Sequence, residues 1–134
     1  MKTLNPSGPN QLDECSIYNV SMDKPLISGV MMAIEDPDKQ LGFQFWPELL
    51  TSDAMLFFFS KEEVRSMHMR NVAFPLLMSW IDKDYKVVSQ IVADPSNTVI
   101  YSSNVPAMYC LESHPALLSR LQIGDELKFT KIEK

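Results

Sequence analysis

The sequence of 134 residues has few of the residues that most catalytic and metal sites require. It contains two histidines, His68 and His114, two cysteines without a CxxC spacing, and four glycines without a glycine-rich phosphate loop. Ser60, Ser66 and Ser79 lack the strand and turn context of a nucleophile elbow. We therefore predict no catalytic residues, no metal site and no cofactor, and we favour a role other than that of an enzyme.

Long apolar runs and an excess of basic residues are also lacking. No run approaches the ~20 apolar residues of a membrane-spanning helix, so we expect no membrane partner. The net charge is −5, and the 12 lysines and arginines are scattered, which argues against a nucleic-acid partner. The N-terminus has one lysine without a following apolar run, so we expect no secretory signal and a protein that is cytoplasmic or packaged in a virus particle.

The two cysteines, Cys15 and Cys110, both lie in segments typical of strands. Two reduced and buried thiols are the favoured interpretation. A disulfide between them stays open as an alternative.

The chain divides into two regions of different composition. Residues 1–11 are polar and contain two prolines and a glycine, which is typical of an arm that cannot bury itself. Residues 12–134 have the length and composition of a single β-rich domain. We expect the arm to contact other protein subunits.

The apolar stretch at residues 55–82 organises the rest of the chain. Residues 55–59 form an apolar, aromatic run that predicts a buried strand. Ser60 with Glu63 three residues later is typical of a capping box, so we expect a short helical turn there. Residues 67–71 then alternate, which predicts a half-buried strand with His68 and Arg70 on one face.

The elements around this stretch are short, and most are strands. Pro75 starts a strand over residues 76–81, and the polar turn at 82–85 predicts a hairpin to residues 86–93. Asp36 suits a helix N-cap followed by Pro37. The other predicted elements are strands at 15–21, 25–35, 98–101 (within a long polar connection at 94–107), 108–112 and 126–132, and a helix at 114–121. We therefore predict a mainly β fold, a compact antiparallel sandwich or partly closed barrel with two short helices.

The order of several motifs resembles one known family. The sequence runs MLFFF at 55–59, HMRN at 68–71, then a proline-led strand that ends in Ile81 and Asp82, then a Val-Val strand. It is similar to the domain of unknown function 192 family, whose pattern is Gly-Met-Leu-Phe, Trp-Met-Lys-Asn and Pro-Leu-Asp. Residues 33–43, 105–112 and 123–125 extend the likeness. The resemblance implies a compact, mainly β domain and no reaction.

The chain departs from this family pattern where the family has charged or distinctive residues. His68 replaces the family's tryptophan, Arg70 its lysine, Leu77 its aspartate and Ala54 its glycine. The family's arginine after Gly-Leu-Met falls at residues 45–46, which are Phe and Trp here. A function that needs the arginine and the aspartate of the family is thereby called into question for this chain.

The polar residues that match family motifs form the candidate site. These are Arg70, Asn71 and Glu112, with His68 beside them, and we assign them to ligand or partner binding. A hydrogen-bonded structural cluster is the alternative. Three functions follow in order of preference: a non-catalytic assembly domain, as in a virus particle or another large complex; a small-molecule or carbohydrate-binding domain; and an uncharacterised enzyme.

Overall fold

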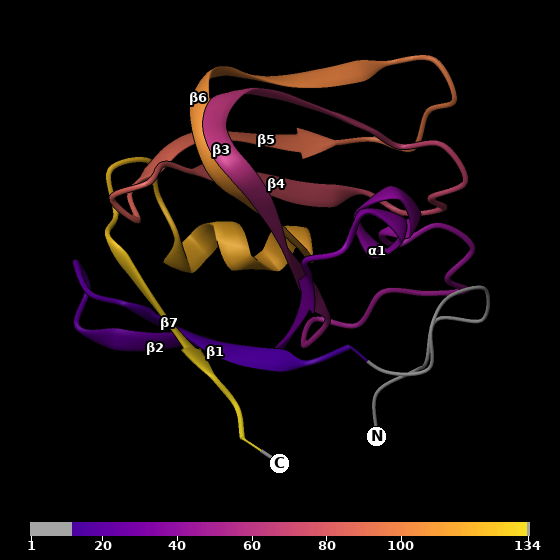
Figure 1. Ribbon diagram of the computed structural model, residues 1–134. Helices are drawn as coiled ribbons and strands as arrows, with labels where there is room; N and C mark the ends of the chain where they lie inside the picture. Colours follow the sequence, from indigo (N-terminus) through magenta and orange to yellow (C-terminus); the bar gives the residue numbers. More distant parts are fainter. Residues whose placement is uncertain (1–11, 134) are drawn as a thin grey trace.

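The computed structural model describes residues 12–133, so the predicted arm at residues 1–11 lies outside the described residues. Seven strands, one α-helix and one 3-10 helix make up the fold (Figure 1). In chain order they are β1 (Glu14–Asn19), β2 (Lys24–Ala33), α1 (Asp36–Leu41), β3 (Ala54–His68), β4 (Leu76–Ile81), β5 (Val87–Ala93), β6 (Ile100–Ser113), η1 (Pro115–Arg120) and β7 (Leu127–Lys131).

The strands form one mixed sheet in the order β5-β4-β6-β3-β2-β1-β7. The prediction of a mostly β, sandwich-like fold with two short helices is confirmed. The sheet is not closed, and one of its pairs is parallel rather than antiparallel. This pair is β2 with β3, and the chain between the two strands passes through α1. A parallel pair needs such a crossover, because the chain must return to the same end of the sheet.

The sheet curls so that the starts of its two edge strands, β5 and β7, lie close together near the hairpin turn between β4 and β5. Lys86 forms a bridge with Glu126, and the backbone N–H of Val87 donates to the carbonyl of Asp125 at 2.9 Å. β1 lies between β2 and β7, with Cys15 opposite Lys131 and Asn19 opposite Leu127. In Figure 1, η1 lies between the two halves of the curled sheet.

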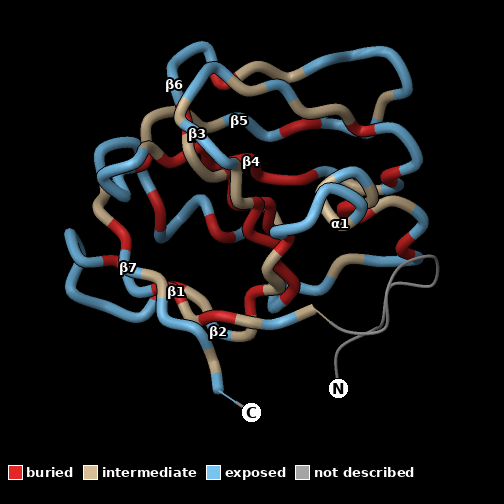
Figure 2. The backbone as a smooth tube through the Cα atoms, viewed as in Figure 1, coloured by how far each residue is buried: buried red, intermediate tan, exposed pale blue. Residues whose placement is uncertain are grey.

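Apolar side chains fill both sides of the sheet. One cluster, which we call the concave core, includes Ile17, Leu56, Leu111 and Leu117 and lies inside the curl. A second cluster lies on the other face and includes Trp46, Phe57, Met78, Trp80 and Cys110. Figure 2 shows β4 as an almost wholly buried strand, in agreement with the burial of all its six residues.

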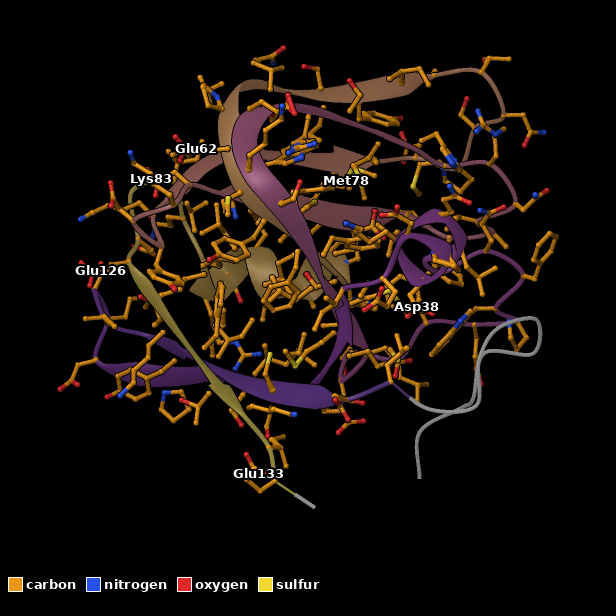
Figure 3. All side chains as sticks on the ribbon, in the orientation of Figure 1. Asp38, Glu62, Met78, Lys83, Glu126 and Glu133 are labelled. Carbon is orange, nitrogen blue, oxygen red and sulfur yellow. The ribbon has the colours of Figure 1, made fainter. Side chains whose placement is uncertain are left out.

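β3 is one continuous strand, so the helical turn predicted at Ser60 to Glu63 is wrong. The ladder between β3 and β6 has a register shift between Phe58 and Glu63 and then continues. Glu62 accepts a hydrogen bond from the backbone N–H of Lys83 at 2.7 Å, and Figure 3 labels both residues. Phe58 and Glu63, on either side of the shift, both pair with β6, so pairing with β6 overrides the local signal.

β6 is likewise a single long strand, where a polar connection with a brief strand at residues 98–101 was predicted. Its first part pairs only with β3, with Ile100 opposite His68. Pro106 lies opposite Val64, beside a second register shift of the ladder, which is where a strand tolerates a proline. The predicted strand at 67–71 ends earlier, at His68, because Asn71 has a φ of 60°.

The helices lie close to their predicted positions. α1 begins at Asp36 with Pro37 in its first turn, but its N-cap is Glu35, which makes no side-chain cap, so the predicted cap at Asp36 is wrong by one residue. η1 is a 3-10 helix capped by His114, whose Nδ1 accepts from the backbone N–H of Ala116 at 3.0 Å.

The cysteines lie in different apolar clusters. Cys15 belongs to the concave core and Cys110 to the opposite cluster, and both are buried free thiols. Burial raises the pKa of Cys15 to about 11 and raises that of Cys110 well above its usual value. Their predicted burial is confirmed.

Candidate functional site

A groove of about 410 Å³ lies where α1 and the loop after it face β3. Its polar lining comes from three separate parts of the chain: Asp36, Lys39, Gln40 and Gln44 from α1 and its loop, Ser60, Arg65, Ser66 and His68 from β3, and Glu112 from β6. Phe57 and Phe59 contribute apolar walls. Ligand sites in proteins have this size and this mixture of apolar walls with a few converging polar groups.

Glu112 is the most unusual residue of the groove, because its side chain is a carboxyl group only 3% exposed. It sits on β6 directly after Leu111, and the alternation of a strand sends Leu111 into the concave core and Glu112 to the opposite face. Burial raises the pKa of Glu112 from 4.5 to about 8, so the group is a neutral carboxylic acid at pH 7. As a neutral acid it offers one O–H donor and an acceptor oxygen.

The C-terminal end of α1 is fitted closely to this part of the groove. Gly42 follows the helix with a φ of 50°, a conformation that costs glycine little. A β-carbon at this position would lie 3.4 Å from the Phe57 ring and 3.9 Å from Oε1 of Glu112. A side chain here would therefore intrude on the space beside Glu112.

Lys39 projects from α1 across the groove to β3. Its Nζ donates to the carbonyl of Phe58 at 2.9 Å, pairs with Asp36 at 3.5 Å and lies 5.6 Å from the centre of the Phe59 ring. The side chain of Lys39 is 19% exposed, whereas that of Asp36 is 86% exposed. The ammonium group is thus held by fixed contacts and largely withdrawn from water.

Arg65 approaches Phe59 from β3 itself. Its guanidinium carbon lies 4.3 Å from the ring centre, its Nη2 donates to the carbonyl of Lys61, and the same nitrogen lies 3.5 Å from Glu63. Its Nε is buried and finds no hydrogen-bond partner within residues 12–133. A buried N–H without a partner costs free energy that a ligand oxygen would recover.

His68 closes the groove at the end of β3. Its Nδ1 accepts a hydrogen bond from the backbone N–H of Arg70 at 3.1 Å. That bond places the proton of the neutral ring on Nε2. Burial, with a smaller contribution from the charge of Arg70, lowers the pKa of His68 below its usual 6.5, so the ring is neutral at pH 7.

The structure brings two of the four predicted site residues into the groove and leaves two outside its lining. His68 and Glu112 line it, whereas Arg70 and Asn71 do not. Asn71 occupies the turn after β3, where its Nδ2 donates to Gln44 at 3.0 Å and its carbonyl accepts from the N–H of Phe45 at 2.9 Å. These contacts hold the loop after α1 against the end of β3.

Sequence reasoning missed Lys39, Phe59 and Arg65 as members of the site. The apolar run at 55–59 marks Phe59 as part of a buried strand, but not as part of a site. Arg65 cannot be assigned to the face of Phe59 by counting, because the register shift between Phe58 and Glu63 breaks the alternation of β3. No comparable signal marks Lys39, which is one of several charged residues on a short helix.

Two of the positions at which the chain departs from the family's charged pattern, Leu77 and Trp46, are buried and apolar. Leu77 belongs to the concave core, and Trp46 packs at 5.0 Å against Phe43 in the opposite cluster. The groove is therefore built from other charged groups of this chain.

A second cavity, of about 570 Å³, opens at the mouth of the curl and has a different lining. Its main residues are aromatic: Phe58, Tyr85, Tyr109 and Phe129, with ring centres 5.2 to 6.5 Å apart where they contact each other. The rings pack mainly on one another, which fits a role in closing the mouth of the concave core.

Between residues 12 and 133, no three histidine, cysteine or acidic side chains lie together in a group suited to a metal ion. None of the described helices is long and apolar enough to cross a membrane.

Comparisons with known proteins give one family and two solved structures. The family model DUF192, described as an uncharacterized ACR, matches residues 19–129. The chain is similar to a crystal structure of a candidate transcription regulator from Sinorhizobium meliloti 1021, with 22% identity, a TM-score of 0.77, and coverage of 91% of this chain and 98% of that one.

A protein of unknown function from Novosphingobium aromaticivorans DSM 12444 has 20% identity and a TM-score of 0.78, with coverage of 94% of this chain and 91% of that one. At these identities the two structures establish the fold alone. A search of curated proteins found no match.

Proposed function

The chain belongs to the uncharacterised DUF192 family, and from that premise we propose that it is a small-molecule-binding domain whose ligand occupies the groove between α1 and β3. The observation that carries this proposal is the burial of Glu112 in the groove. A carboxyl group in such a place lowers stability, and strongly perturbed acids in clefts are concentrated at functional sites.

The surroundings of Glu112 support binding. Donors are available from Arg65 and Lys39 and from Nε2 of His68. The Phe57 and Phe59 rings supply apolar area. The groove thus offers both the polar groups that orient a ligand and the walls that exclude water.

A blocking variant tests this function. Ser66 is an exposed lining residue, so Ser66→Trp should fill the groove without disturbing the fold. Ser119→Trp is the matched control, because Ser119 is exposed on η1 and outside the groove. We expect compounds of a metabolite-sized panel that raise the melting temperature of the native chain and of Ser119→Trp to lose that effect in Ser66→Trp. Equal responses of all three chains would contradict the proposal.

Assembly with other protein subunits is a second proposal, favoured by the edge strand β5. Its sequence VVSQIVA has no charge and no proline, and Ile91 and Val92 are 42% and 41% exposed. The other edge strand, β7, carries Lys128 and Lys131, which discourage pairing between sheet edges. An uncharged edge can pair with a strand of a partner or of a second copy.

Native mass measured by light scattering tests this second proposal. We expect a mass above 15.3 kDa for the native chain or its co-purified complex, and a return to the monomer mass in Ile91→Lys. Ile34→Lys is the control, since Ile34 is similarly exposed but lies beyond the end of β2. A monomer for the chain purified from its own source would refute assembly, including assembly in a virus particle.

A further inference from the structure

We propose that the groove takes a small organic anion whose carboxylate group is bound by Arg65 and Lys39 and accepts a hydrogen bond from the acid of Glu112. This inference rests on the proposed function, and it adds the chemical class of the ligand.

The first support is the distribution of charge across the groove. The two cations are withdrawn from water, with side chains 19% exposed for Lys39 and 20% for Arg65. Their carboxylate partners are more exposed, at 86% for Asp36 and 45% for Glu63. Water screens exposed charges more than buried ones, so the inner part of the groove keeps a positive potential that favours an anion.

The second support is the unpaired donor of Arg65. Its Nε–H is buried and has no acceptor within residues 12–133, although Nη2 contacts the carbonyl of Lys61. A guanidinium group binds carboxylates through adjacent N–H groups, and such charge-assisted bonds are stronger than neutral ones. A ligand carboxylate would supply the missing acceptor.

The third support is the protonation of Glu112. An ordinary organic acid is ionised at pH 7, while burial keeps the proton on Glu112. The two groups then match as an O–H donor and a carboxylate acceptor rather than repel each other. An ionised Glu112 would repel the same ligand.

The walls distinguish an organic carboxylate from a wholly polar anion. The Phe59 ring lies 5.6 Å from the ammonium of Lys39 and 4.3 Å from the guanidinium carbon of Arg65, and Phe57 and Met67 add further apolar surface to the lining. Inorganic phosphate has no apolar part to place against these side chains. A short alkyl chain bearing a carboxylate matches both the cations and the walls.

The experiment uses butyrate, with butyramide, inorganic phosphate and xylose as comparison probes, and follows amide shifts of the full chain by NMR. We expect butyrate to shift amides of α1 and β3 and to bind at least tenfold more tightly than butyramide. Arg65→Gln should weaken butyrate binding at least tenfold. Arg120→Gln removes the same charge from an exposed arginine on η1, outside the groove, so it should leave binding unchanged.

Dependence on pH provides a readout that a merely structural role of Glu112 would not change. The charged and titratable groups that line the groove or lie near Glu112 are Asp36, Lys39, Arg65, His68 and Cys110. Glu112, whose pKa is about 8, loses its proton between pH 7 and pH 9, so affinity for butyrate should fall about tenfold over this range. Glu112→Gln keeps a neutral donor and should bind butyrate with no such fall.

The outcomes separate this inference from the proposed function. If xylose or butyramide binds in the groove as tightly as butyrate, the assignment of a carboxylate ligand is overturned. The groove would still be a small-molecule site. Butyrate affinity that is unchanged in Arg65→Gln would also overturn it. If no probe binds and Ser66→Trp changes no response to the wider panel, both the inference and the proposed function fail.

Discussion

Leu111 and Glu112 are neighbours on β6, yet they lie in two regions where burial has opposite effects on the free energy of the folded chain. Leu111 is fully buried among the apolar side chains of the concave core, whereas Glu112 is buried in a groove with two cations and a histidine. In the concave core, burial lowers the free energy of the folded chain. In the groove, burial of an acid raises that free energy, so we interpret the same degree of burial as packing at Leu111 and as part of the proposed ligand site at Glu112.

The largest effect is expected from Leu111→Ala, which removes packing from the concave core alone. Truncation of a fully buried leucine should lower the free energy of unfolding by about 3–5 kcal/mol. Urea denaturation, monitored by circular dichroism, measures this loss of stability. Ligand binding in the groove should persist where the variant is folded. A loss below about 1 kcal/mol would show that the concave core can collapse around the change.

A smaller effect of opposite sign is expected from Glu112→Gln at high pH. In the native chain, Glu112 has a pKa of about 8 when folded and about 4.5 when unfolded. The unfolded chain therefore releases its proton first as pH rises, and stability falls between pH 4.5 and pH 8. Glutamine does not ionise, so the variant does not lose stability in this way. It should be more stable than the native chain by roughly 2–4 kcal/mol at pH 8 and should show a flatter dependence of stability on pH.

Denaturation at a series of pH values checks this expectation. Glu48→Gln is the matched control, because Glu48 is exposed and should keep the native pH profile. Should Glu112→Gln follow the native profile instead, Glu112 would have to be ionised in the folded chain.

The sequence predicts these regions best where the structure depends on neighbouring residues, and less well where it depends on pairing between distant strands. The hairpin of β4 and β5 follows from Pro75 and the polar turn at 82–85, which are local, and the structure confirms it. At Ser60 to Glu63 the local capping signal is real, but the ladder with β6 outweighs it. Local patterns therefore predicted the positions of the strands, but they did not predict that β3 continues through residues 60–63.

The groove was predictable only in part, because its members are distant in sequence. Lys39 and Arg65 are brought together by the parallel crossover from β2 through α1 to β3, which periodicity did not reveal. Glu112 and His68 were identified through positions in family motifs. Arg70 and Asn71 came from the same motif as His68, but the chain turns at Asn71, which has a positive φ, and neither residue lines the groove.

The smallest effect is expected at the mouth of the concave core, from Tyr85→Phe. Burial first, and then a hydrogen bond with Tyr85, raises the pKa of Tyr109 to about 12. Loss of the hydroxyl should lower this pKa, yet keep it above 10, because burial is the greater cause. Ultraviolet titration of tyrosinate measures the shift. The free energy of unfolding should change by only about 0.5–1.5 kcal/mol, and a pKa of 10 or below would contradict the assigned burial.

The pairing of β1 with β7 has a consequence for how the chain is made. About 110 residues separate Asn19 from its partner Leu127, so β1 leaves the ribosome long before the strand that covers its outer edge exists. At 5–20 residues per second, the wait is roughly 5 to 20 seconds. During that time β1 can pair with β2, but its other edge stays open to neighbouring nascent chains. Synthesis of β7 is therefore the step that covers this edge and protects the domain from aggregation.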